Sequence, residues 1–76
     1  MSGETVSELD RFEAPWHKQV TLQDVRHESG LRMLRVRIKE GTRFTVMDID
    51  EATAAHWGKA MSDWAQSGGQ AGEQQD

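Results

Sequence analysis

The chain has 76 residues, a formal net charge of −4 at pH 7 and no cysteine. A chain of this length forms one domain at most, with a core that supplies only ~3–5 kcal/mol of net stability. Disulfides and thiolate metal sites are excluded, so oligomerisation is the remaining aid to stability. The N-terminus lacks a basic segment followed by an apolar run, and no apolar run approaches the ~20 residues that span a bilayer. We therefore expect a cytoplasmic protein.

Residues 1–14 are polar and acidic, and their large apolar residues after Met1 are Val6, Leu9 and Phe12, spaced three apart. A helical turn this short is not stable on its own. We expect a flexible acidic tail that can dock through Phe12. Pro15 then marks the start of the folded domain, which we place at residues 15–66.

Three strands are predicted, over residues 17–27, 31–39 and 42–48, joined by two tight turns. Each turn is a three-residue loop with a glycine in third place, Gly30 in the first and Gly41 in the second. These loops would set Val20 opposite Ile38 in the first hairpin and Val36 opposite Phe44 in the second. The apolar residues that this register gathers on one face are Val20, Leu22, Leu34, Val36, Ile38, Phe44 and Val46.

A helix is predicted over residues 50–66. Asp48 with Glu51 fits a capping box, and Asp50 is an alternative cap. The apolar residues Ala54, Trp57, Met61 and Trp64 recur at helical spacing and would cover the core face of the sheet. Ser67, Gly68 and Gly69 end the helix, and residues 67–76 are expected to form a disordered tail. The predicted fold is α+β, a three-stranded antiparallel meander packed on one C-terminal helix (β-β-β-α).

The second face of this sheet would be left bare. Its candidate interface residues are Val25, Leu31, Met33, Met47 and Ile49, with Trp16 beside them. An uncovered apolar patch of this kind marks an interface. Three covers are open: a second copy of the chain, another protein, or Phe12 and Trp16 folding back. A small non-enzymatic interaction module, acting as a homodimer, is the function that we expect.

The basic residues are concentrated in one part of the chain. Between Arg26 and Arg43 there are six basic and two acidic residues, against three basic and eleven acidic elsewhere. A candidate patch for an anionic partner consists of Arg35, Arg37, Lys39 and Arg43. The alternative function is therefore a nucleic-acid-binding regulator that uses the basic strands. The pI of about 5.2 and the lack of an interleaved aromatic residue argue against it. A solvated strand face that resists aggregation explains the same residues.

The sequence offers no catalytic, metal or cofactor site. His17, His27 and His56 have no metal-binding spacing, and no hydroxyl has a recognisable nucleophile setting. A cluster of Asp24, Arg26, Arg32 and Asp48 is predicted at one edge of the core face, with Arg32 opposite Asp48. It could grip an acidic partner, but a cross-strand ion pair accounts for it. A small enzyme or enzyme subunit is the third alternative.

The run from Glu28 to Ala65, ESGLRMLRVRIKEGTRFTVMDIDEATAAHWGKAMSDWA, resembles short bacterial proteins of unknown function. The shared features are turn glycines and core residues. The resemblance supports the fold and implies no activity, cofactor or partner.

Overall fold

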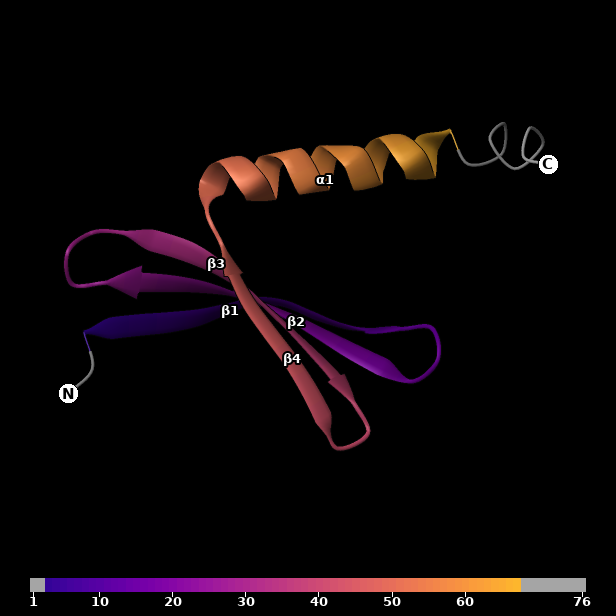
Figure 1. The fold of residues 1–76 in the computed structure, drawn as a ribbon, viewed down its shortest axis with the longest axis horizontal. Coiled ribbons are helices and arrows are strands. Elements are labelled where there is room, and N and C mark those ends of the chain that lie inside the picture. The colour runs from indigo at the N-terminus through magenta and orange to yellow at the C-terminus, as the bar shows by residue number, and fades with distance from the viewer. Residues whose placement is uncertain (1–2, 68–76) are drawn as a thin grey trace.

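The computed structural model describes residues 3–67, which form a four-stranded antiparallel sheet followed by one helix (Figure 1). The strands lie in the sheet in chain order, β1-β2-β3-β4. The elements are β1 (Glu4–Ala14), β2 (Lys18–His27), β3 (Arg32–Glu40), β4 (Arg43–Ile49) and α1 (Glu51–Gln66). The α+β class and the antiparallel meander are confirmed, but the sheet has four strands where three were predicted.

The fourth strand is β1, in the segment that was predicted to be a flexible tail. It pairs with β2 along its whole length, and a bulge between Glu8 and Asp10 interrupts the register. The prediction failed because a bulge breaks the alternation of apolar and polar residues that identifies a strand. The connecting loop is tight, since Trp16 and His17 take left-handed φ values of 68° and 58°.

The hairpin between β2 and β3 has the predicted register. Val20 pairs with Ile38, and Val25 pairs with Met33. Gly30 has a φ of 96°, which a side chain would disfavour. The prediction that Gly30 occupies a loop position with positive φ is therefore confirmed.

The register predicted between β3 and β4 is wrong. Val36 pairs with Met47 rather than with Phe44, because the loop contains only Gly41 and Thr42. Gly41 has a φ of 59°, and Thr42 is not among the residues with positive φ, which is the pattern of a type II′ turn. Relative to the prediction, the pairing moves by three residues, an odd number, so every β4 side chain changes face.

The sheet therefore has two faces with a different composition from the one predicted. The helix-side face includes Phe12, Val20, Leu22, Leu34, Val36, Ile38, Met47 and Ile49. The charged face includes Val6, Arg11, Thr21, Val25, Met33, Arg35, Arg37, Lys39, Phe44, Val46 and Asp48. The start of α1 lies on the helix-side face, because Glu51 bonds to Arg32, which alternation places on that side.

The helix begins at the alternative cap. Asp50 has extended backbone, and its Oδ1 accepts a hydrogen bond of 2.8 Å from the Thr53 amide. The predicted helix 50–66 is confirmed to Gln66, and Ser67 is the C-cap. The rest of the predicted C-terminal tail lies outside the described residues.

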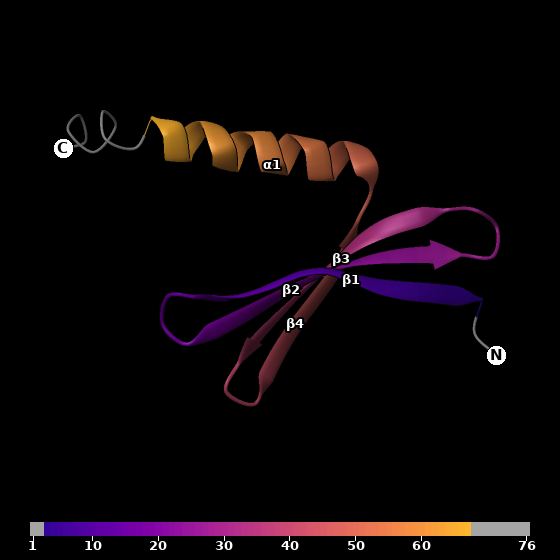
Figure 2. The same cartoon turned by 180° about the vertical axis from the view of Figure 1, so that it is seen from behind.

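The prediction that α1 covers the sheet is wrong. Figures 1 and 2 show α1 leaving the end of β4 and running beside the sheet, and its contacts with the sheet are mainly with β3. No helix residue is buried, and Trp57, Met61 and Trp64 are 41%, 56% and 72% exposed. Within residues 3–67 the buried residues are only Thr21, Val25, Val36 and Ile49. One copy of the chain thus has a very small core.

Candidate interaction surfaces

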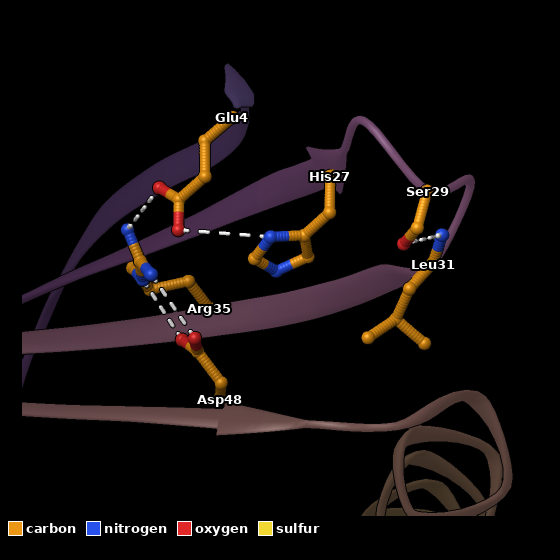
Figure 3. A network of polar contacts seen from close by, with 6 residues as sticks. All are labelled: Glu4, His27, Ser29, Leu31, Arg35 and Asp48. Carbon is orange, nitrogen blue, oxygen red and sulfur yellow. Dashed lines mark hydrogen bonds and ion pairs between the residues drawn. The ribbon is translucent and has the colours of Figure 1, made fainter. Parts of the chain in front are cut away.

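A polar network on the charged face joins all four strands (Figure 3). Arg35 on β3 makes a two-pronged contact with Asp48 on β4, with Nε–Oδ1 and Nη2–Oδ2 distances of 2.8 and 3.0 Å. On the other side, Arg35 Nη1 lies 4.0 Å from Glu4 Oε1 on β1. Glu4 Oε2 in turn lies 3.9 Å from Nδ1 of His27 on β2. The network ties the outer strands together at the end of the sheet nearest α1.

The electrostatics of the network follow from these contacts. The hydrogen bonds from Arg35, and then its charge, lower the pKa of Asp48, while desolvation opposes them. The same hydrogen bond raises the pKa of Arg35. Both groups are therefore held in their charged forms. A carboxylate fixed by a two-pronged guanidinium serves structure, and it has little freedom to act as an acid or base.

The structure separates the residues of the predicted anionic-partner patch. Arg35 is engaged by Asp48, and Arg43 lies on the helix-side face next to the turn. Arg37 and Lys39 remain together on the charged face. Their cationic groups lie 5.3 and 5.9 Å from the centre of the Phe44 ring. The predicted register had assigned Phe44 to the core, so the basic patch was predicted without an aromatic residue.

The predicted apolar interface is also divided between the two faces. Val25 and Met33 lie on the charged face, where Val25 is fully buried. Met47 and Ile49 lie on the helix-side face, where Met47 is 42% exposed and Ile49 is buried.

Two further residues of that predicted interface lie in loops. Leu31 follows the turn after β2, and Trp16 lies in the loop before β2, with 57% and 71% of their surface exposed. The six residues therefore do not form one patch.

The predicted ionic cluster is partly present. Arg26 Nε donates to Asp24 Oδ2 at 2.8 Å, and Arg32 Nη1 lies 3.9 Å from Asp24 Oδ1. Asp48 is not a member, because the corrected register places it on the other face. Arg32 contacts Glu51 instead, with an Nε–Oε2 distance of 2.7 Å. This contact ties the start of α1 to β3.

An exposed apolar surface is contributed by the helix-side face and by α1. We call it the helix–sheet surface, and its exposed members are Phe12, Met47, Trp57, Met61 and Trp64. The start of α1 is joined to the sheet by the bond between Glu51 and Arg32, and the contacts of α1 with the sheet are mainly with β3.

A cavity of about 210 Å³ lies at that junction. Leu9, Leu34 and Ala54 are its apolar lining residues on this side, and Asp24, Arg32, Asp50 and Glu51 also line it. Among these, sequence reasoning gave no role to Leu9, the bulged residue of β1. No sequence signal marks a bulge at this position.

Within residues 3–67 no group of three or more His, Asp or Glu side chains could hold a metal ion. Over the same residues, no helix is long and apolar enough to cross a membrane.

Comparison with known proteins gives a family and no activity. No curated protein and no solved structure matches the chain. A family described only as of unknown function, DUF6967, matches residues 3–67, which cover all five elements of the fold. The chain belongs to this family of unknown function.

Proposed function

We propose that the protein is a small non-enzymatic interaction module and that it works as a homodimer assembled through the helix–sheet surface. The observation that carries the proposal is the exposure of three apolar helix residues, Trp57, Met61 and Trp64, beside a sheet face that also exposes Phe12 and Met47. Several large apolar side chains left exposed on so small a protein support a binding surface.

The exposed area is of the size that association requires. An aromatic side chain carries ~150–250 Å² of surface. With 46%, 41% and 72% exposed, Phe12, Trp57 and Trp64 leave on the order of 300 Å² of ring surface uncovered in one copy. Two copies would supply roughly half of the ~1,200 Å² at which specific interfaces begin, from these rings alone. The methionines and sheet residues add the remainder.

Two neighbouring residues of β4 provide a matched test. Met47 points to the helix-side face and Val46 to the charged face, and they are 42% and 51% exposed. Met47→Glu places a charge in the proposed interface, so we expect a folded monomer. Val46→Glu should remain dimeric. Sedimentation velocity of the wild type and both variants measures this, with circular dichroism to show that each is folded.

Two results would contradict the proposal. A wild-type protein that sediments as an 8.6 kDa monomer at millimolar concentration would reject the homodimer. A dimer that Val46→Glu dissociates and Met47→Glu does not would move the interface to the charged face.

The second candidate function is nucleic-acid binding by the charged face. It is favoured by Phe44, which pairs with Lys39 in the corrected register and has the cationic groups of both Arg37 and Lys39 within about 6 Å of its ring centre. These residues line a shallow hollow with Arg11. An aromatic ring flanked by cations is the arrangement on which an unpaired base stacks.

Titration with a single-stranded oligonucleotide at low salt tests this candidate. If it holds, amide resonances of Arg37, Lys39 and Phe44 shift, and the affinity falls steeply as salt rises. Arg37→Glu should abolish binding, whereas Arg43→Glu, on the opposite face, should change it little. An absence of shifts at low salt, or an equal loss in both variants, would remove this candidate.

A further inference from the structure

We infer that two copies of α1 pair antiparallel in the dimer, with Trp64 of each copy seated in the other copy's cavity beside Ala54. This inference rests on the proposed homodimer. It specifies which residues meet across the two-fold axis.

The first argument is the spacing of the apolar stripe. Its four members, Ala54, Trp57, Met61 and Trp64, are separated by three, four and three residues. The spacing reads the same in both directions. In an antiparallel pair centred near residue 59, Ala54 therefore faces the partner's Trp64, and Trp57 faces the partner's Met61. A two-fold interface requires this reciprocity, since residue i meets j and j meets i.

The sizes and chemistry of the paired residues also match. The smallest member of the stripe, Ala54, faces Trp64, the more exposed of its two tryptophans. The sulfur of Met61 faces the Trp57 ring, which is a favourable contact. A parallel pair would instead set Trp64 against Trp64 and Ala54 against Ala54, leaving a gap at one end and crowding at the other.

The second argument is the cavity, which is independent of the spacing. Ala54 lines it together with Leu9 and Leu34, and its volume is about 210 Å³. An apolar cavity of ~150 Å³ is enough to hold a benzene ring, so this one accepts an indole. It is smaller than the ~300–1,000 Å³ of ordinary small-molecule sites. The cavity thus suits a single aromatic side chain of a partner.

Asp24 on the rim supplies a polar partner for that side chain. Its carboxylate is 18% exposed and already accepts from Arg26, which leaves acceptor capacity for an indole N–H. Buried tryptophans usually make such a bond.

The charged residues of α1 do not oppose the pairing. Lys59 lies on the side of the helix opposite the stripe, because five residues from Ala54 correspond to about 500° of rotation. Lys59 is engaged there by Asp63, with an Nζ–Oδ2 distance of 2.6 Å. The residues that flank the stripe include Gly58, Ala60 and Ala65, which let two helices approach closely.

Cysteine cross-linking tests the pairing, because the chain has no cysteine of its own. Positions 54 and 64 lie about 15 Å apart along one helix, too far for a disulfide within a chain. A mixture of Ala54→Cys and Trp64→Cys proteins should form a disulfide-linked dimer under mild oxidation. Each protein alone should form at most one tenth as much.

Exchanging the residues at positions 54 and 64 provides a second test, because the exchange keeps one tryptophan and one alanine in each pair. Ala54→Trp should clash with the incoming Trp64, and Trp64→Ala should leave two cavities empty, so each should weaken dimerisation at least tenfold. The double variant Ala54→Trp/Trp64→Ala restores a large residue opposite a small one and should recover the affinity to within about threefold.

The outcomes separate this inference from the homodimer on which it rests. Efficient self-linking of Ala54→Cys alone would show parallel helices and overturn the inference. A dimeric wild type with no cross-link in the mixture and no recovery in the swap would overturn the helix pairing and leave the homodimer standing. A monomeric wild type would reject both.

Discussion

Arg35 is the residue that most clearly holds the two outer strands together. Its side chain is 24% exposed, and it reaches Asp48 on one side and Glu4 on the other. Isolated surface ion pairs contribute little, but a two-pronged guanidinium–carboxylate pair with restricted solvent access contributes about 1 kcal/mol or more. In a chain with four buried residues in the described part, that is a substantial share of the stability.

This ion pair should make folding stability depend on pH at the acidic end. The pKa of Asp48 is lowered in the folded protein by Arg35, so the stabilisation is complete above the unfolded value of about 3.9 and is lost as pH falls through the folded value. We expect Asp48→Asn to cost about 1 kcal/mol at pH 7. The difference between wild type and variant should disappear towards pH 2. Urea unfolding at one fixed protein concentration measures both.

Asp63→Asn is the matched control for Asp48→Asn. Asp63 pairs with Lys59 within the helix, and the two side chains are 60% and 77% exposed. Pairs of this kind contribute ~0.5 kcal/mol or less. A loss as large for Asp63→Asn as for Asp48→Asn, or a difference at Asp48 that persists at pH 2, would contradict the structural role of Arg35.

At the scale of elements, the β2–β3 hairpin and the helix α1 were predicted correctly, because their local sequence patterns are strong. Strand β1 and the register of β4 were not, because each depends on a single residue. Gly30 with the apolar pattern around it was enough for the hairpin between β2 and β3. The helix followed from its stripe and its cap. In both cases several local signals agreed on the same structure.

The two failures have specific physical causes. The bulge at Leu9 hid β1, because it shifts half of that strand by one residue relative to the other. Between β3 and β4, a glycine can occupy the third position of a three-residue loop or the first position of a two-residue loop. Sequence alone did not decide between these turns for Gly41. Because the wrong turn was chosen, Phe44 and Met47 were each assigned to the wrong face of the sheet. The residues predicted for both the apolar interface and the basic patch were therefore partly wrong.

The position of α1 was wrong for a different reason. The prediction assumed that an amphipathic helix must cover the sheet of its own chain. Only Asp50 separates β4 from α1, and the helix leaves the sheet instead of folding onto it. An apolar stripe indicates which side of a helix is suited to burial. It does not indicate whether the same chain or another chain covers that side.

The described part of the molecule, residues 3–67, is elongated, with extents of 53 × 30 × 15 Å, and has little interior in one copy. Its thin shape follows from a single sheet layer with a helix beside it (Figure 2). Stable domains usually consist of at least two packed layers. In the proposed dimer, the helices of the two copies provide the second layer, so that folding and association are coupled.

Coupled folding and association predict that thermal stability depends on protein concentration. For a dimer that unfolds to two chains, a tenfold increase in concentration stabilises the folded form by about 1.4 kcal/mol. For two chains of this length, that should raise Tm by roughly 3–6 °C. Differential scanning calorimetry over a hundredfold concentration range measures the effect. The Tm of Met47→Glu should be lower and should not vary with concentration, because its interface carries a charge. A constant wild-type Tm would show that one copy is stable alone, and the exposed stripe of α1 would then need a different partner.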